Sequence, residues 1–167
     1  ARLKKEAALG RAEARRLAGN PEVALEQYRS LLEDERGLAP EVLLSAKLGL
    51  AITLGETGDV AAAVELFHGI MESAAGSSAA LESLRELGVL YRRQAGFHRS
   101  VVWYQRYLEQ AAEAPDRARV RLDLARVFSR IQLYEDAIAL FSDLMGSGSA
   151  EAHIGLAETL ERSGQKK

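Results

Sequence analysis

The residues of this sequence that could carry acid–base or metal chemistry are scattered. The three histidines, His68, His98 and His153, are far apart, and the chain has no cysteine. The HExxH, GxSxG, Walker and GxGxxG patterns are absent, and GSGSAE at 146–151 departs from the last of these at its final position. We therefore expect no metal, no cofactor and no enzymatic activity.

The composition favours an all-α protein. The sequence is 47% apolar and 28% charged, which is a globular balance, and it is dominated by Ala, Leu, Glu and Arg, which enter helices at low cost. A net charge of −2 provides no general field for a polyanion, so we expect neither a nucleic acid nor a membrane as partner. The remaining partner class is protein or peptide.

Targeting signals are also missing. No apolar run approaches the length of a membrane span, and ARLKKEAALG lacks the apolar core of a signal peptide, which favours a cytoplasmic location. The first residue is not Met and the last residues follow a turn signal, so we expect a fragment of a longer protein. The excess of Arg over Lys is typical of a GC-rich, bacterial genome.

An internal repeat organises the chain. KLGLAITLGETGD at 47–59 returns as HIGLAETLERSGQ at 153–165, with Gly, Leu, Ala, Thr, Leu and Gly in the same places. Such self-similarity indicates stacked helical units that cover one another's apolar faces. The helical patterns predict helices at 2–18, 21–36, 40–57, 59–75, 77–95, 97–113, 115–132, 134–146 and 149–163.

Each predicted pair carries a small residue followed four positions later by an aromatic ring. The pairs are Ala24 with Tyr28, Ala63 with Phe67, Ser100 with Tyr104 and Ala137 with Phe141. Small side chains let two helix axes approach closely, and the ring fills the neighbouring gap. We expect Asn20 and Asp59 to cap helices, and Pro40 and Pro115 to begin them.

This pattern resembles the tetratricopeptide repeat (TPR) family, in the form of divergent bacterial-type repeats. The closest match is LGVLYRRQAGFHRSVVWYQRYL, in which Leu87, Gly88, Tyr91, Phe97, Ser100, Tyr104 and Leu108 fall where the family expects them. The resemblance implies a right-handed α-solenoid of antiparallel helix pairs. We expect a single domain over 1–167, with repeats near 4–38, 40–76, 78–113 and 115–147 and a last helix at 149–164.

The resemblance also implies that the first helices of the pairs line a partner-binding groove. Transferred position by position, it predicts partner-binding residues at Leu48, Ile52, Arg85, Val89, Arg92, Arg119, Arg126 and Arg130. Their arginines and apolar side chains suit an acidic segment with apolar anchors, because the arginine fork pairs with carboxylates. The alternative is a solvated face of ion pairs between groups three or four residues apart, such as Arg119 with Asp123.

Other features leave further alternatives open. Trp103 could mark a second contact surface or pack on a neighbouring helix, and a scaffold that self-associates through the sixth helix and the end helices is the alternative function. RNA binding is less favoured, because the predicted grooves of the outer repeats are acidic or neutral. The chaperone-binding TPR clamp needs several asparagines, and Asn20 is the only one, so an Hsp70 or Hsp90 adaptor is not expected.

Three glycines recur at one groove position. Gly10, Gly49 and Gly155 each stand inside a predicted helix, where glycine costs about 1 kcal/mol relative to alanine. Either a partner's backbone approaches the groove floor there, or the glycine is a packing habit of this repeat variety.

Overall fold

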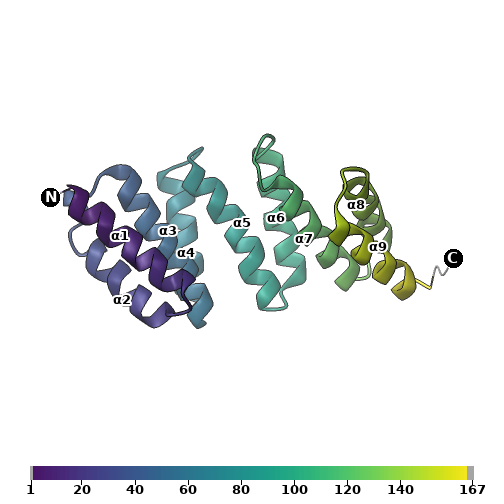
Figure 1. Cartoon of the computed structure of the whole chain (residues 1–167), viewed down its shortest axis with the longest axis horizontal. Helices are drawn as coiled ribbons and strands as arrows, with labels where there is room; N and C mark the ends of the chain where they lie inside the picture. The colour runs from purple at the N-terminus through teal and green to yellow at the C-terminus, as the bar shows by residue number, and fades with distance from the viewer. Residues whose placement is uncertain (1, 165–167) are drawn as a thin grey trace. The chain divides into compact units, whose positions relative to one another are not determined.

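The computed structural model describes residues 2–164 and is all-helical over that range (Figure 1). Its helices fall into two compact units that divide between Glu86 and Leu87. Helix α5 (Ser78–Arg93) begins in unit 1 and continues into unit 2. The prediction of an all-α chain built from helix pairs is confirmed.

Unit 1 contains two complete helix pairs. They are α1 (Arg2–Leu17) with α2 (Pro21–Leu32), and α3 (Pro40–Thr57) with α4 (Val60–Ser73). Helix α3 packs against α1, α2 and α4, so it is buried along most of its circumference. Leu31 and Leu38 join Val42 and Ala46 of α3 in one apolar cluster of this unit.

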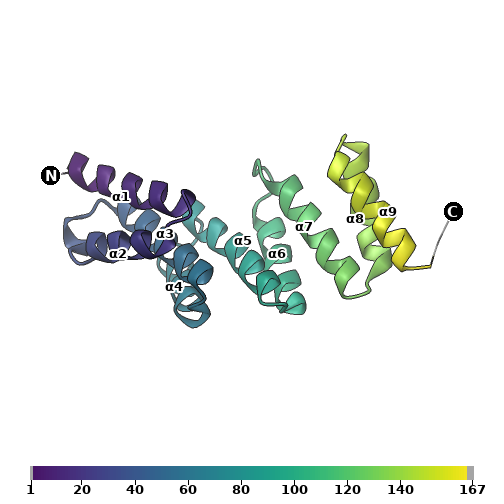
Figure 2. The same ribbon diagram turned by 60° about the horizontal axis from the view of Figure 1, so that its bottom comes forward.

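Unit 2 contains α6 (Phe97–Gln110), α7 (Arg117–Arg130), α8 (Tyr134–Gly146) and α9 (Ala150–Arg162). Helix α7 packs against α6, α8 and α9, and it is the central helix of this unit (Figure 2). It buries Val120, Leu124, Ala125 and Val127 almost completely. The residues of α7 that were predicted to bind a partner therefore stand on a helix that is fixed by packing on several sides.

The small-residue positions are closely packed, as predicted. Ala24, Ala63, Ser100 and Ala137 have no exposed surface. The rings four residues later, Tyr28, Phe67, Tyr104 and Phe141, are at most 1% exposed. Alternating small and large side chains thus let the helices approach one another.

Glycines receive some of these rings directly. A Cβ added to Gly49 would overlap the ring of Tyr28, one added to Gly88 would overlap Tyr104, and one added to Gly155 would overlap Phe141. At Gly49 and Gly155 the space beside the backbone is therefore filled by the chain's own ring. The interpretation that a partner's backbone approaches these glycines is wrong for these two positions, because the site is already occupied.

Several predicted helix ends differ from the structure by two or more residues; α6, for example, ends at Gln110 and not at 113. Helix α2 ends at Leu32, and a short 3-10 turn (Glu35–Gly37) follows it. Helix α7 begins at Arg117 and not at Pro115. Before it, the Arg117 N–H closes a turn on the Ala114 carbonyl at 3.1 Å, and the Tyr107 hydroxyl donates to the Asp116 carboxylate.

Two of the predicted helix-start residues, Asp59 and Pro40, are confirmed, and the prediction for Asn20 is wrong. Asp59 caps α4, accepting from the Ala62 N–H at 3.3 Å, and Pro40 is the first residue of α3. Asn20 does not cap α2 with its side chain, because its amide nitrogen donates back to the Ala18 carbonyl at 3.3 Å. The turn before α2 uses the side chain that the prediction assigned to the cap.

None of the described helices is long and apolar enough to cross a membrane. Within residues 2–164, no three His, Asp or Glu side chains come together as a group that could hold a metal ion.

Candidate functional site

A charged cleft lies within unit 2, with a volume of about 890 Å³. Most of its lining comes from the end of α5, the second half of α7 and the second half of α9, and α6 and α8 contribute Phe97 and Phe141. Five arginines and two glutamates line it: Arg92, Arg93, Arg126, Arg130, Arg162, Glu158 and Glu161. We call this site the arginine cleft. Its excess of positive charge stands in a chain whose net charge is −2.

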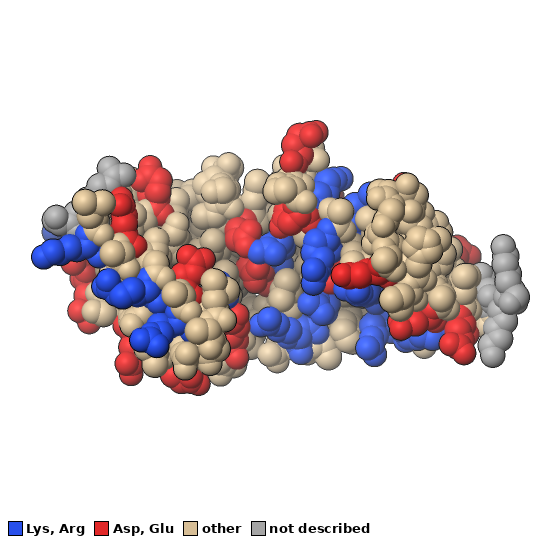
Figure 3. All heavy atoms as spheres, viewed as in Figure 1, with Lys and Arg blue, Asp and Glu red and all other residues tan. Residues whose placement is uncertain are grey.

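Helix α7 supplies a row of charged side chains on one face. Arg119, Asp123, Arg126 and Arg130 follow one another at intervals of three or four residues, which places them on neighbouring turns. On the face drawn in Figure 3, basic side chains gather over the region where Figure 1 places α7. Asp123 is the buried member of the row, with 8% of its surface exposed.

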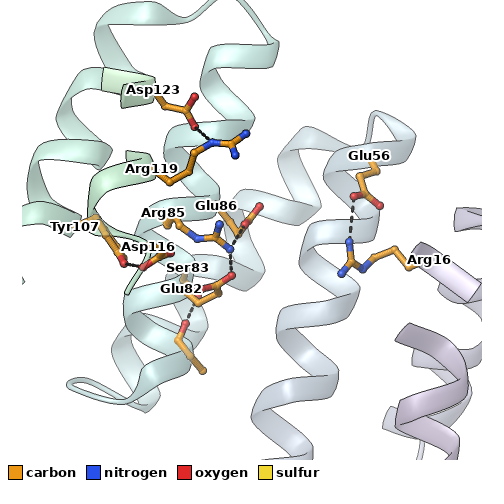
Figure 4. Close-up of polar contacts among 11 residues, drawn as sticks. Arg16, Glu56, Glu82, Ser83, Arg85, Glu86, Tyr107, Asp116, Arg119 and Asp123 are labelled. Atoms are coloured by element: carbon orange, nitrogen blue, oxygen red, sulfur yellow. Dashed lines mark hydrogen bonds and ion pairs between the residues drawn. The ribbon is translucent and has the colours of Figure 1, made fainter. Parts of the chain in front are cut away.

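Asp123 organises two of these arginines. Its Oδ2 lies 3.9 Å from Arg119 Nε, and its Oδ1 lies 3.4 Å from Arg126 Nη1 (Figure 4 shows the first pair). Arg126 also reaches across to α9, where its Nη2 is 2.9 Å from Glu151 Oε2. The alternative of a face of ion pairs therefore describes Arg119 and Arg126 correctly.

Arg92 is held by a tyrosine. Its Nε donates to the Tyr104 hydroxyl at 3.3 Å, and Tyr104 itself is fully buried between α5 and α6. Burial acts to lower the pKa of the Arg92 guanidinium, but the hydrogen bond to Tyr104, with the charges of Tyr104 and Asp123, outweighs burial and raises it. The hydrogen bond to Tyr104 holds this guanidinium in place in the lining of the cleft.

Arg93 and Arg130 are different. Both are exposed, and neither forms a hydrogen bond or an ion pair with any residue in the described range. They stand in the last turns of α5 and α7, where a positive charge also favours the helix dipole. These two guanidinium groups are the arginines of the cleft that no described residue binds.

The α9 side of the cleft combines a buried hydroxyl pair with exposed charges. Thr159 Oγ1 donates to Ser129 Oγ at 3.0 Å, and Arg162 Nη1 donates to the same Ser129 oxygen at 3.3 Å. Both hydroxyl residues are buried. This bond fixes Arg162 in the cleft, while Glu158 and Glu161 face solvent beside it.

The predicted site residues divide between the two units. Arg92, Arg126 and Arg130 line the arginine cleft together, whereas Arg119 is bound to Asp123 outside its lining. Val89 is half-buried in the part of α5 that belongs to unit 2. Leu48 and Ile52 are half-buried on α3 in unit 1, and their predicted role in binding a partner stays a prediction.

Arg85, also in unit 1, is engaged by its own helix. Figure 4 shows its guanidinium between Glu82 and Glu86, and its Nη2 lies 2.8 Å from Glu86 Oε1. The two glutamates share one cation and so do not simply repel each other. A neighbouring pair in unit 1 joins α1 to α3, with Arg16 Nη1 3.3 Å from Glu56 Oε1.

Sequence reasoning missed the α9 side of the site. Glu158, Glu161 and Arg162 were not among the predicted partner-binding residues, but they are exposed and line the cleft. The repeat register contained the signal: with Leu156 and Ala157 aligned to Leu87 and Gly88, these residues occupy the groove positions. Trp103 is half-buried on α6, with the Arg106 guanidinium 4.9 Å from its ring centre.

Comparisons with known proteins identify the type of fold. No family model matches the sequence, and no curated protein matches it. Among solved structures, the TPR-like repeats described for a Podosopora anserina kinesin light chain superpose with a TM-score of 0.80 at 19% identity, covering 98% of this chain and 88% of that chain.

Two further structures superpose similarly. Pseudomonas aeruginosa pilF gives a TM-score of 0.76 at 18% identity, over 95% of this chain and 68% of that chain. MamA from AMB-1 gives 0.69 at 18% identity, over 98% and 84%. Likeness at such low identity establishes architecture, and the chain therefore has a TPR-like α-solenoid fold.

Proposed function

We propose that this chain is a protein-interaction module, and that unit 2 binds an acidic segment of a partner protein in the arginine cleft. The TPR-like fold supports a binding scaffold, because each helix pair presents side chains from a fixed position on a stacked framework. The proposal assigns the chain no reaction of its own.

One observation carries the proposal. Arg93 and Arg130 are exposed in the cleft without a partner in the described residues, although the neighbouring arginines Arg92, Arg126 and Arg162 all have one. A charged face that served only solubility would gain from pairing these groups with the many acidic residues of the chain. Two unpaired guanidinium groups that line a concave surface instead suit an incoming segment rich in carboxylates.

The fixed arginines would lower the cost of binding. Arg92 is tied to Tyr104 and Arg162 to Ser129, so these side chains lose little rotamer freedom when a partner arrives. Phe97 is half-buried and lines the same cleft, which provides an apolar contact beside the charges. An extended or helical segment with acidic residues and an apolar anchor fits this chemistry.

The test begins with a displayed library of random peptides selected on the native chain. We expect enrichment of acidic residues around an apolar position. Affinity of the best peptide is then measured by fluorescence anisotropy with the double variant Arg93→Glu, Arg130→Glu. Two lost charge-assisted contacts, each of about 1.5–3 kcal/mol, should weaken binding by about a hundredfold or more.

The matched control is Arg15→Glu, Arg29→Glu. These arginines are also exposed, stand in the last turns of α1 and α2, and make no side-chain hydrogen bond or ion pair with a described residue. The control makes the same change in net charge and should bind as the native chain does. Equal weakening by both variants, selection of peptides without acidic residues, or tighter binding of single-stranded RNA than of the peptide would contradict the proposal.

A further inference from the structure

Helix α1 exposes an apolar face. Leu3 is 80% exposed and Leu17 is 71% exposed, and they stand at the two ends of a stripe of exposed apolar residues at helical spacing. Between them lie Ala7, Gly10 and Ala14. A helix on a protein surface ordinarily carries charged or polar residues on the side opposite its buried face. We call this stripe the α1 face.

Gly10 shows that this face lacks a covering group. Gly49 and Gly155, at the equivalent repeat position, are each covered by a ring of the preceding helix, Tyr28 or Phe141. A Cβ added to Gly10 would meet nothing within 4 Å. The α1 face therefore has the same open space beside its glycine backbone as the inner helices have, but no described residue of the chain fills that space.

Helix α9 exposes a second apolar face. Ala150, Ile154 and Ala157 follow one another on its outer side, opposite the buried Ala152, Gly155 and Thr159. Ile154 is 63% exposed, the largest exposure of a big apolar side chain in unit 2. We call this stripe the α9 face. Ile154 projects from this face, and its side chain is of a size that could fill the space beside a helical glycine.

The charges beside the two faces are opposite. Lys4, Arg11 and Arg15 are exposed along one side of the α1 face, at helical angles that differ by only about 40°. Glu158 lies on the corresponding side of the α9 face, and Glu161 continues the face toward the end of α9. Neither glutamate side chain bonds to a described residue.

These charges specify the direction of packing. When two helices pack antiparallel, corresponding sides of their contact stripes face each other, whereas parallel packing brings opposite sides together. Antiparallel packing therefore places the basic side of α1 against Glu158, and it places Glu13 on the other side of α1 near His153. Parallel packing would instead bring Glu13 toward Glu158.

From these observations we propose that the α9 face of one copy of this chain packs antiparallel on the α1 face of a second copy, with Ile154 seated over Gly10. Such an interface is head-to-tail, because it joins two different surfaces, and repetition of it produces rings or open chains of molecules. It does not involve Arg93 or Arg130, which carry the proposed peptide binding, but its Glu158 and Glu161 also line the arginine cleft.

The proposal is tested by analytical ultracentrifugation of the 167-residue chain over a hundredfold range of concentration. We expect the average mass to rise with concentration and to fall when salt is added, because the flanking charges are screened. Gly10→Glu and Ile154→Glu should each leave a monomer. Both positions are exposed, and Gly10 is open, so neither change should disturb the fold.

Mixing the two variants gives the decisive result. Each retains one intact face, so an equimolar mixture should form a one-to-one dimer and nothing larger. Val102→Glu is the matched control, since Val102 is 45% exposed on α6 and should not affect association. A native chain that stays monomeric, an Ile154→Glu variant that still associates, or loss of association in Val102→Glu would each overturn the proposal.

Discussion

Replacing Gly88 with alanine is expected to lower the free energy of unfolding of unit 2 by about 1–3 kcal/mol, the usual cost of overpacking a core. This reverses the ordinary effect, because alanine in place of a mid-helix glycine normally stabilises a helix by about 1 kcal/mol. The added Cβ would overlap ring atoms of Tyr104, which is fully buried and whose overlapping atoms include those nearest its backbone. The ring has no room to move aside.

Urea unfolding followed by fluorescence would measure this effect. Trp103 is the chain's single tryptophan and adjoins Tyr104 on α6, so its emission reports on unit 2. Gly146→Ala is the control, since Gly146 ends α8 in the same unit and a Cβ there meets nothing within 4 Å. The control should be neutral or slightly stabilising. Equal stability of the native chain and Gly88→Ala would show that the ring does not lie against this glycine.

Truncating Phe141 to alanine should cost more, about 3–5 kcal/mol. The side chain is 1% exposed, and its ring covers the backbone of Gly155 on α9. Removing it leaves a cavity between α8 and α9 that the packed helices cannot fully close. The same urea titration would measure the loss, and Phe141→Leu, which keeps most of the volume, should lose less than about 1.5 kcal/mol.

A double-mutant cycle tests the contact itself. Gly155→Ala alone should be destabilising, because its Cβ would overlap the Phe141 ring. In the Phe141→Ala background that overlap is gone, so Gly155→Ala should be neutral or stabilising there. We expect a coupling free energy of about 1 kcal/mol or more, within the range measured for residues in contact. Additive effects of the two changes would contradict the packing described above.

The predicted helices were accurate because their signals are local. Pro40 begins α3 and Gly58 ends it in a left-handed conformation, as the residue types alone indicate. The start of α7 was misplaced because it depends on Tyr107, a residue of the preceding helix, whose hydroxyl binds Asp116. Asn20 was predicted to cap α2, but its side-chain amide donates to the Ala18 carbonyl in the preceding turn. Asparagine is common both in turns and at helix N-caps, so the residue type does not distinguish the two roles.

The sequence by itself determined that the chain is a series of helix pairs and that arginines recur on the first helices, because helical periodicity and repeat register are properties of neighbouring residues. Only the tertiary structure decided which arginines remain uncommitted. Arg126 finds Glu151 on another helix, whereas Arg130, one turn later on the same face, finds no partner in the described residues. Likewise, Gly155 is covered by an aromatic ring, whereas Gly10, at the equivalent repeat position, is open. The reason is that the contacts of a helix face depend on helices distant in the sequence.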